Sequence, residues 1–263
     1  MSLMIDQQTK LLGVVGQNIG YTLSPAIHNF SFSSININAV YLSFDIKEDK
    51  FKKAIDGLLE VSLGLNFTIP YKERIIEFLD SIDDRAEKLG AVNTTVGRRG
   101  FNTDFEAVKT LVKERIDSLE GRKCLIYGAG GAARAASFAL AELGCTILLV
   151  NRTKERAEEL ADRIRGYGYE AKVTEDCHEA DVTVNTTPDP EKLPCHGSKL
   201  VIEFVYRPVE TTLIKSAKSL GIDSINGIQI LVRQALYAER LWFNNSVPDM
   251  KVLEYLYARK LVW

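Results

Sequence analysis

A glycine-rich turn between a predicted strand and a predicted helix constrains the fold of this chain more than any other feature. Residues 122–164 read RKCLIYGAGGAARAASFALAELGCTILLVNRTKERAEELADRI. The order is apolar strand, glycine turn, alanine-rich helix, second strand, polar turn and charged helix. Strands that alternate with helices in this way favour a parallel sheet covered by helices.

The turn itself fits the pattern G-x-G-x-x-A at Gly128, Gly130 and Ala133. In this pattern the first glycine makes the tight turn, the second lets the backbone approach a pyrophosphate, and the small third residue lets helix and strand pack closely. The helix N-terminus then offers free N–H groups to phosphates. The pattern predicts a dinucleotide site, with a structural turn or a non-redox nucleotide as the alternatives.

The end of the second strand predicts which dinucleotide binds. An NAD site usually places an acidic residue there to hold the ribose 2′-hydroxyl, but this chain has Asn151 and Arg152, with Arg156 one turn later. Guanidinium groups bind a 2′-phosphate through paired charged hydrogen bonds. The sequence therefore favours NADP over NAD. The alternative is that both arginines only solvate the start of a helix.

The first part of the chain repeats the alternation of strands and helices over residues 11–110. The predicted strands are LLGVVG, AVYLSFDI, VSLGLNFT and AVNTTVG, and the helical patterns between them are SPAIHNFSFSSI, KEDKFKKAIDGLLE and YKERIIEFLDSI. We expect a largely parallel sheet here too. Thr103 and Glu106 are spaced as a capping box for the helix that follows.

The last part of the chain adds strands and then helices. The predicted strands are DVTVNTTP, LVIEFVY and GIDSING, and the predicted helices are GIQILVRQALYAERLWF and VPDMKVLEYLYARKLVW.

Charge and hydropathy exclude several classes of protein. The 33 basic and 35 acidic residues give a net charge of −2, which gives no support for nucleic-acid or membrane-surface binding through bulk electrostatics. No apolar run approaches the roughly 18 residues of a membrane span, and the start, MSLMIDQQTK, lacks the pattern of a signal peptide. We therefore expect a soluble, cytoplasmic protein.

The cysteines and histidines predict no metal site. Cys124 and Cys145 lie in apolar, strand-like runs and are interpreted as small core residues of a reduced protein. The cysteines and histidines show neither C-x-x-C spacing nor any other spacing typical of metal ligands. Besides Cys124 and Cys145, they are Cys177, Cys195, His28, His178 and His196.

Several polar residues of the first part occupy unusual positions. Lys72 follows Pro70 at a predicted helix start, where the macrodipole disfavours a cation, so it is either a solvated charge or a proton carrier. Ser24 precedes Pro25, and helix capping alone would explain it. Gln234 lies on an apolar helix face, where an amide needs a partner.

Taken together, these residues give the chain a resemblance to the shikimate dehydrogenase family. The matching segments occur in the family's order from residue 13 to about residue 243: GYTLSPAIHN, NFTIPYKE, GAVNT, FNTD, GAGGAAR, NRTKERA, NTTP, FVYRP and GIQILVRQA. The resemblance implies a two-domain α/β enzyme that reversibly reduces 3-dehydroshikimate to shikimate with NADPH, in the synthesis of aromatic amino-acid precursors.

The resemblance also implies a domain division and a role for individual residues. Residues 1–104 would bind substrate, residues 105–228 would form a Rossmann NADP domain, and helices in 229–263 would pack back on the first domain. Lys72 and Asp104 would be the catalytic pair. The substrate would contact Thr22 and Ser24 through its carboxylate and, through its hydroxyls, Asn66, Thr68, Asn93, Asp104, Tyr206 and Gln234. NADP would contact Gly128, Gly130, Gly131, Ala132, Asn151, Arg152, Thr153, Arg156, Thr186 and Gly227.

The chain departs from the family pattern at a few positions. The usual HSxSP is YTLSP, so that Tyr21 replaces histidine and Thr22 replaces serine, and Glu203 stands where aspartate is usual. These changes bear on preference between shikimate and quinate. The alternatives are a quinate/shikimate dehydrogenase that uses NAD and a non-catalytic NADP-binding regulator. The assembly is expected to be a monomer or a homodimer.

Overall fold

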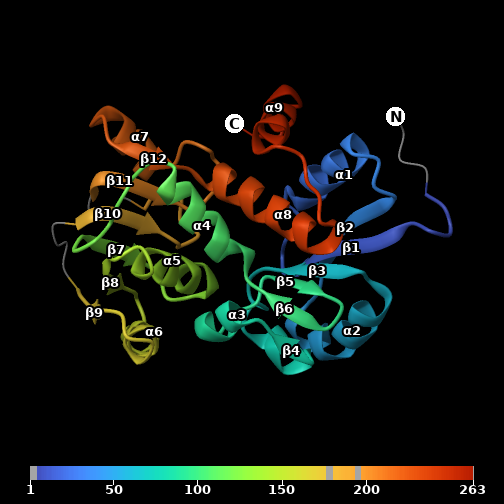
Figure 1. Ribbon diagram of the computed structural model, residues 1–263, viewed down its shortest axis with the longest axis horizontal. Helices are drawn as coiled ribbons and strands as arrows, with labels where there is room; N and C mark the ends of the chain where they lie inside the picture. The colour runs from blue at the N-terminus through green and yellow to red at the C-terminus, as the bar shows by residue number, and fades with distance from the viewer. Residues whose placement is uncertain (1–4, 176–179, 193–196, 263) are drawn as a thin grey trace. The chain divides into compact units, whose positions relative to one another are not determined.

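Two six-stranded sheets organise the chain, one in each of two units (Figure 1). The computed structural model describes residues 5–175, 180–192 and 197–262. Unit 1 comprises Met1–Thr103 and Val232–Leu261, and unit 2 comprises Asp104–Leu231 and Val262–Trp263. Two α/β domains were predicted, and the structure confirms this fold class.

The sheet of unit 1 is mixed. Its strand order is β2-β1-β3-β5-β6-β4, with bounds β1 Lys10–Gly16, β2 Ala39–Asp45, β3 Gly64–Phe67, β4 Ser81–Ile82, β5 Thr94–Val96 and β6 Arg99–Phe101. β1 pairs in parallel with β2 and β3, as predicted, but β5 runs antiparallel to both β3 and β6. The β5–β6 hairpin turns at Gly97, whose φ of 52° suits glycine in a two-residue loop.

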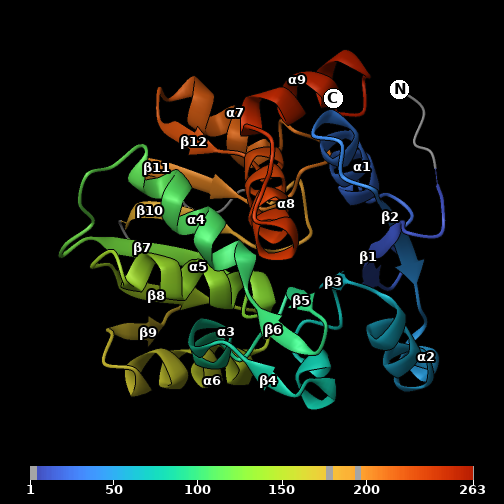
Figure 2. The same cartoon turned by 45° about the vertical axis from the view of Figure 1, so that its right-hand side comes forward.

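Helices at both ends of the chain pack within unit 1. The bounds are α1 Ser24–Ser34, α2 Glu48–Val61, η1 Arg74–Phe78, α3 Asp84–Leu89, α8 Gly227–Phe243 and α9 Asp249–Ala258. Helix α8 begins in unit 2 and continues into unit 1 at Val232. Helix α9 lies against α1 (Figure 2), where the rings of Phe30 and Tyr255 stack at 4.0 Å.

The segment YKERIIEFLDSI is not the helix that its apolar spacing predicts. It forms the short 3-10 helix η1 and then β4. The backbone N–H of Asp80 donates to Arg98 O at 3.0 Å, and that of Asp83 donates to Gly100 O at 2.9 Å. Pairing with the neighbouring strand therefore overrides the helical spacing, because so short a helix gains little stability of its own.

Unit 2 has an all-parallel sheet with strand order β12-β11-β10-β7-β8-β9. This is the order of a doubly wound Rossmann sheet, with the change of direction between β7 and β10. The strands are β7 Lys123–Tyr127, β8 Thr146–Val150, β9 Ala171–Val173, β10 Ala180–Asn185, β11 Gly197–Glu203 and β12 Asp223–Ile225. The helices are α4 Thr103–Lys113, α5 Gly131–Ala141, α6 Lys154–Gly166 and α7 Thr212–Ser219.

Small side chains let α5 approach the sheet of unit 2 closely. Ala133, Ala135, Ala136 and Ala139 on this helix are fully buried, and the helix contacts β7 and β8. The facing strands carry continuous apolar runs, as expected for parallel strands that are buried on both faces. The sequence predicted this packing from Ala133 in the glycine pattern.

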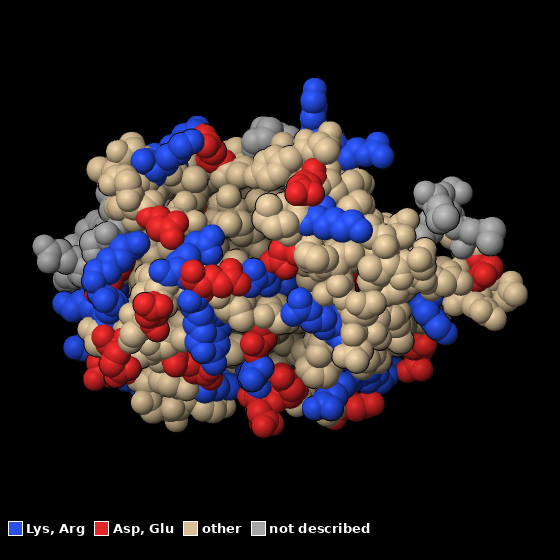
Figure 3. All heavy atoms as spheres, turned by 45° about the horizontal axis from the view of Figure 1, so that its top comes forward, with Lys and Arg blue, Asp and Glu red and all other residues tan. Residues whose placement is uncertain are grey.

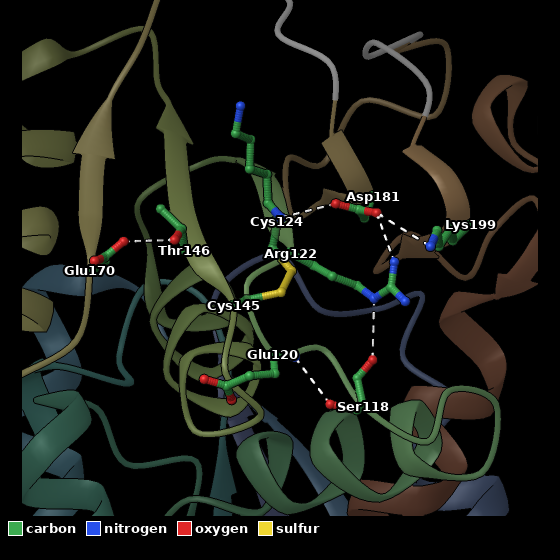
Figure 4. Close-up of a disulfide and its surroundings, with 10 residues drawn as sticks. Ser118, Glu120, Arg122, Cys124, Cys145, Thr146, Glu170, Asp181 and Lys199 are labelled. Atoms are coloured by element: carbon green, nitrogen blue, oxygen red, sulfur yellow. Dashed lines mark hydrogen bonds and ion pairs between the residues drawn. A yellow bond between two sulfur atoms is a disulfide. The ribbon is translucent and has the colours of Figure 1, made fainter.

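A disulfide joins Cys124 on β7 to Cys145, just before β8 (Figure 4). The prediction that both are unpaired core thiols is therefore wrong, although both side chains are buried. Parallel pairing of Lys123 with Thr146 brings the two cysteines together with a Cα–Cα distance of 6.0 Å, which suits a disulfide. Strand register creates this proximity, and the sequence of either strand alone does not reveal it.

Basic and acidic side chains are mixed on the surface. Lysine and arginine alternate with aspartate and glutamate over the face shown in Figure 3. In the described part of the chain, no helix combines the length and apolar character that a membrane crossing requires. Cys177, Cys195, His178 and His196, which entered the metal-site prediction, lie outside the described residues.

Candidate active site

A buried hydrogen-bonded group of amides and hydroxyls lies at one end of the unit 1 sheet. Asn66, at the end of β3, donates from Nδ2 to Thr94 Oγ1 at 2.9 Å and to the Asn93 carbonyl at 3.2 Å. Thr94 Oγ1 donates in turn to Asn93 Oδ1 at 3.0 Å. The antiparallel register Asn66↔Thr94 produces this contact. The antiparallel pairing of β3 with β5, which the sequence did not predict, therefore places the amides side by side.

The same group extends to the C-terminal helix α8. Asn93 Nδ2 donates to Thr103 Oγ1 at 3.0 Å and lies 3.5 Å from Gln234 Oε1, although Asn93 and Gln234 are 141 residues apart. The Thr103 hydroxyl also lies 3.5 Å from Gln234 Oε1. Helix α4 begins at Thr103 itself, and its hydroxyl bonds Asn93 and Gln234. The predicted capping box of Thr103 and Glu106 is therefore wrong.

Thr22 and Ser24 meet at the start of α1. The Thr22 hydroxyl donates to Ser24 Oγ at 3.3 Å, and Ser24 N donates back to Thr22 Oγ1 at 3.3 Å. Ser24 is the first helical residue, and the N-cap position belongs to Leu23, with no side-chain cap bond. Capping by Ser24, the alternative that the sequence left open, is therefore excluded. The Ser24 hydroxyl lies close enough to Tyr41 to lower the pKa of that phenol, against the larger effect of burial.

Lys72 lies in a turn, outside any helix. Tyr71 N donates to Thr68 O at 2.8 Å, and the Lys72 carbonyl accepts from Val92 N at 2.8 Å, next to Asn93. The Lys72 side chain is half-buried, and the 3-10 helix begins only at Arg74. The expected conflict between Lys72 and a helix dipole is therefore absent. Two backbone bonds hold the turn that carries Thr68 and Lys72.

The two residues of the predicted catalytic pair belong to different units. Lys72 belongs to unit 1, whereas Asp104 is the first residue of unit 2 and is 6% exposed. Asp104 directly follows Thr103 of the amide group in the first turn of α4. The pairing of Lys72 with Asp104 remains a prediction.

The glycine turn of unit 2 has the shape that a phosphate-binding loop requires. Gly128 has φ 116°, and a Cβ there would lie 2.2 Å from Thr186 Oγ1. The Thr186 hydroxyl donates to Tyr127 O at 2.7 Å. Gly130 is the N-cap of α5, and a Cβ at Gly130 would have no neighbour within 4 Å. Gly131 and Ala132 follow as the first residues of α5, so the loop leaves backbone N–H groups open to an anion.

Polar residues follow β8, the strand that lies beside β7 in the sheet. Asn151 Nδ2 donates to Thr153 O at 2.7 Å, and Thr153 is the N-cap of α6. Arg152 and Arg156 are exposed on either side of this helix start. Gly128 N bonds Val150 O at 2.9 Å, so the glycine turn and the end of β8 are directly joined. The residues present therefore fit a dinucleotide with a 2′-phosphate.

The buried side chain of Glu203, the last residue of β11, organises the segment that follows this strand. Glu203 Oε1 accepts from Val205 N at 2.9 Å and from Asn185 Nδ2 at 3.0 Å, and Oε2 accepts from Thr211 Oγ1 at 3.0 Å. Burial raises the pKa of Glu203, against the effect of these donors. The carboxylate thus fixes the segment after β11 that carries half-buried Tyr206.

Gly227 packs against this same segment. A Cβ at Gly227 would lie 2.3 Å from the Val205 carbonyl oxygen, so no other residue fits there without a shift of the backbone. Sequence reasoning missed the role of Asn185, Glu203 and Tyr41. For Asn185 and Glu203 the available signal was a polar residue inside an apolar strand, which requires a partner when buried; a tyrosine in a strand gives no such signal.

The described residues contain no group of three or more histidine, cysteine, aspartate or glutamate side chains that could hold a metal ion. The chemistry that unit 1 offers comes from neutral amides and hydroxyls, together with one lysine. Such groups suit a ligand with several hydroxyls, each of which donates and accepts hydrogen bonds. Unit 2 offers backbone donors and guanidinium groups, which suit phosphates.

Comparison with known sequences matches both units to family models. Residues 14–95 match the shikimate dehydrogenase substrate binding domain, and residues 110–196 match the shikimate / quinate 5-dehydrogenase model. The shikimate dehydrogenase (NADP(+)) of Saccharolobus solfataricus is 55% identical over 265 residues, with 98% of each chain covered.

Solved structures agree with these sequence matches. A shikimate dehydrogenase crystallised with NADP+ superposes with a TM-score of 0.87 at 32% identity, covering 98% of each chain. The shikimate 5-dehydrogenase of Thermus thermophilus, crystallised with NADP(H) and shikimate, has a TM-score of 0.81 at 31% identity, covering 96% of this chain and 100% of that one. The chain therefore belongs to the shikimate dehydrogenase family.

Proposed function

We propose that this chain catalyses the reversible NADPH-dependent reduction of 3-dehydroshikimate to shikimate. The observation that carries the proposal is the buried group of Asn66, Asn93 and Gln234, whose amides are tied together by Thr94 and Thr103. Amides held in this way act as fixed donors and acceptors for a ligand that carries several hydroxyls. Family membership identifies that ligand as shikimate or its ketone.

Substrate binding divides between two ends of the unit 1 site. Thr22 and Ser24 donate hydrogen bonds to the carboxylate of the substrate. Asn66, Thr68, Asn93 and Gln234 bind its hydroxyls, together with Asp104 and Tyr206. This assignment rests on the Thr22–Ser24 pair and on the hydrogen-bonded group of Asn66, Asn93 and Gln234, both within unit 1.

The cofactor NADPH supplies a hydride to the carbonyl carbon when it is bound. In unit 2, backbone N–H groups around Gly128, Gly130, Gly131 and Ala132 hold its pyrophosphate. Asn151, Arg152, Thr153 and Arg156 hold the adenosine ribose and its 2′-phosphate. Thr186 and Gly227 line the nicotinamide end.

The chain itself manages one proton. In the proposed reaction Lys72 donates a proton to the carbonyl oxygen during reduction and removes it from the hydroxyl during oxidation. Asp104 holds Lys72 and the reacting oxygen in register. A positioned group of this type contributes roughly 10²–10⁴ to the rate.

The steady-state rate of NADP reduction, followed through NADPH absorbance, tests the function directly. Shikimate with NADP should give the highest kcat/KM, followed by quinate with NADP and then shikimate with NAD. A higher kcat/KM for quinate with NAD would establish the quinate/shikimate dehydrogenase instead. Tight NADP binding without turnover of either acid would establish the non-catalytic regulator.

The proposal includes a cytoplasmic location and a monomeric or homodimeric assembly. All residues of the proposed site come from one chain, so catalysis requires no second copy. Light scattering of the purified protein measures the assembly. Fractionation of cells that express the chain measures the location.

A further inference from the structure

Tyr41 on β2 is a fully buried polar side chain that the proposed reaction leaves without a role. It is 0% exposed, and its hydroxyl donates to Asn66 Oδ1 at 2.6 Å. A buried tyrosine hydroxyl needs a partner, and here the partner is an amide of the proposed substrate site. The hydrogen bond raises the question of whether Tyr41 orients Asn66 or Asn66 orients Tyr41.

The orientation of the Asn66 amide follows from its neighbours. Its nitrogen lies 3.2 Å from the carbonyl oxygen of Asn93, which only accepts hydrogen bonds. The amide nitrogen must therefore face Asn93, and the amide oxygen must face Tyr41. Because Asn66 Oδ1 only accepts, the Tyr41 hydroxyl must be the donor.

The same reasoning fixes the direction of the bonds beyond Tyr41. With its hydrogen given to Asn66, the Tyr41 oxygen is left as an acceptor, and near it Ser24 accepts from Thr22 at 3.3 Å. Burial raises the pKa of Tyr41 well above its ordinary value, so the hydroxyl keeps its proton. The donors therefore run from Thr22 to Ser24 and from Tyr41 to Asn66.

These hydrogen bonds leave Asn66 with one hydrogen-bonding group that is available to a ligand. Its two N–H groups donate to Thr94 and Asn93, and one lone pair of Oδ1 accepts from Tyr41. An amide has two donors and two acceptor lone pairs. In the described structure, the second lone pair of Oδ1 is therefore what Asn66 offers.

The backbone and the ring of Tyr41 are both held by buried neighbours. Its backbone N–H and C=O are both bonded to the Asn29 amide at 2.9 Å. The His28 ring stacks on it, with centroids 4.1 Å apart, and His28 Nδ1 lies 2.8 Å from Glu239 Oε1. Ser31 donates to the other Glu239 oxygen at 2.5 Å, and His28, Ser31 and Glu239 are all fully buried. Helix α8, which carries Gln234, thus also supports Tyr41.

We propose that Tyr41 is a positioning residue for substrate binding, which fixes Asn66 so that Oδ1 accepts a hydrogen bond from a substrate hydroxyl. The inference rests on the proposed function, because it requires that Asn66 contacts shikimate. Tyr41 itself touches no substrate atom. Its contribution passes entirely through Asn66.

Tyr41→Phe tests the proposal because it removes one oxygen atom and keeps the ring that stacks on His28. We expect the KM for shikimate to rise roughly three- to tenfold, the value of one neutral hydrogen bond. The kcat and the KM for NADP should change less than twofold. Thr94→Val, which loosens the same amide from its other side, should raise the KM for shikimate similarly.

Tyr71→Phe is the matched control. Tyr71 is also 0% exposed, donates to a backbone carbonyl at 2.6 Å and stacks on an aromatic ring, Phe51. The Tyr71→Phe substitution should lower the melting temperature as much as Tyr41→Phe does, but it should leave the KM for shikimate unchanged. Equal KM changes in the two variants would overturn the role of Tyr41.

Asn66→Ala and the double variant separate this inference from the proposed function. If Tyr41 acts through Asn66, the double variant should bind shikimate no worse than Asn66→Ala alone. Additive effects would overturn the inference and leave the function standing. An unchanged KM in Asn66→Ala would remove Asn66 from the substrate site, and the inference would fail with that assignment.

Discussion

The two proposed binding regions are built in opposite ways. In unit 1, side chains fill the site, and almost every hydrogen-bonding group of Asn66, Asn93 and Thr94 is satisfied by a neighbour. In unit 2, missing side chains make the site, because a Cβ at Gly128 would collide with Thr186 and one at Gly130 would enter open space. The first region depends on individual atoms, and the second depends on the path of the backbone.

This difference determines how mutations should act. A single atom removed from unit 1 should change binding or catalysis with little effect on the fold. Changes in unit 2 should act through the shape and stability of the loop, except at the exposed arginines. Four sets of variants test this contrast, and they are ordered by the size of the effect that we expect.

Lys72→Met should give the largest effect, since it removes an amine and keeps most of the stem. We expect kcat for shikimate oxidation to fall by roughly 10²–10⁴, with the KM for shikimate less affected. Single-turnover and steady-state rates measure this. A near-normal kcat, with shikimate and NADP both still bound, would show that Lys72 is only a solvated charge. Lys10→Met is the control for the loss of a positive charge, because Lys10 is an exposed residue of β1.

Removal of the Cys124–Cys145 disulfide should test whether the unit 2 loop depends on its backbone path. The bridge closes a segment with a sequence separation of 21 that contains the whole glycine turn and α5. The double variant Cys124→Ala/Cys145→Ala should lose about 2–4 kcal/mol of unfolding free energy. Denaturant unfolding with and without dithiothreitol measures it.

The reductant provides the control for that experiment. Dithiothreitol should destabilise the natural chain and leave the double variant unchanged. Equal stability of the natural chain in both conditions, with thiol titration confirming reduction, would show that the bridge does not support unit 2.

Arg152→Ala tests the exception within unit 2, where a side chain and not the backbone should bind the ligand. Losing one charged hydrogen bond costs about 1.5–3 kcal/mol, so the KM for NADP should rise and that for NAD should stay nearly constant. Lys154→Ala is the matched control, since Lys154 is a cation of the same helix start that pairs with Glu175 at 3.0 Å. Equal effects on both dinucleotides would refute 2′-phosphate binding by Arg152.

Glu203→Gln should give the smallest effect and tests a part of unit 2 that is built like unit 1. Burial raises the folded-state pKa of Glu203 above its ordinary value of 4.5. Between the unfolded and folded pKa values the folded state holds more protons, so this group's contribution to stability falls as pH rises through that window.

The melting temperature of Glu203→Gln should therefore fall less with rising pH than that of the natural chain, measured over roughly pH 4 to 8. Its slope should be flatter than that of the natural chain. Identical slopes would show that Glu203 does not change protonation on folding.

The contrast between the units also explains what the sequence could predict. The Rossmann unit has local signals, since the glycine turn, the alanine-rich helix and the apolar strands are contiguous, and the structure confirms them. The α/β class of unit 1 was also predictable. Its β5–β6 hairpin and η1 were not, because strand pairing with partners elsewhere in the chain decided them.

The site of unit 1 could be predicted only in part. Polar residues such as Asn66 and Gln234 stood out individually, but their connection depends on contacts across 141 residues. Tyr41 gave no signal, because a tyrosine in a strand is ordinary until its partner is known. The disulfide was missed for the same reason, since an apolar strand accommodates a thiol and a bridge equally well.

The proposed orientation of the Asn66 amide, which leaves one lone pair of Oδ1 for a substrate hydroxyl, has a consequence for the choice of synthetic inhibitors. A deoxyfluoro analogue of shikimate would place a fluorine, which cannot donate, opposite an oxygen that can only accept. The two electronegative atoms would repel each other, whereas the simple deoxy analogue loses the bond without that repulsion. An amino replacement restores a donor. Inhibitors aimed at this position should therefore keep an N–H or O–H, and isosteric fluorination there should weaken binding.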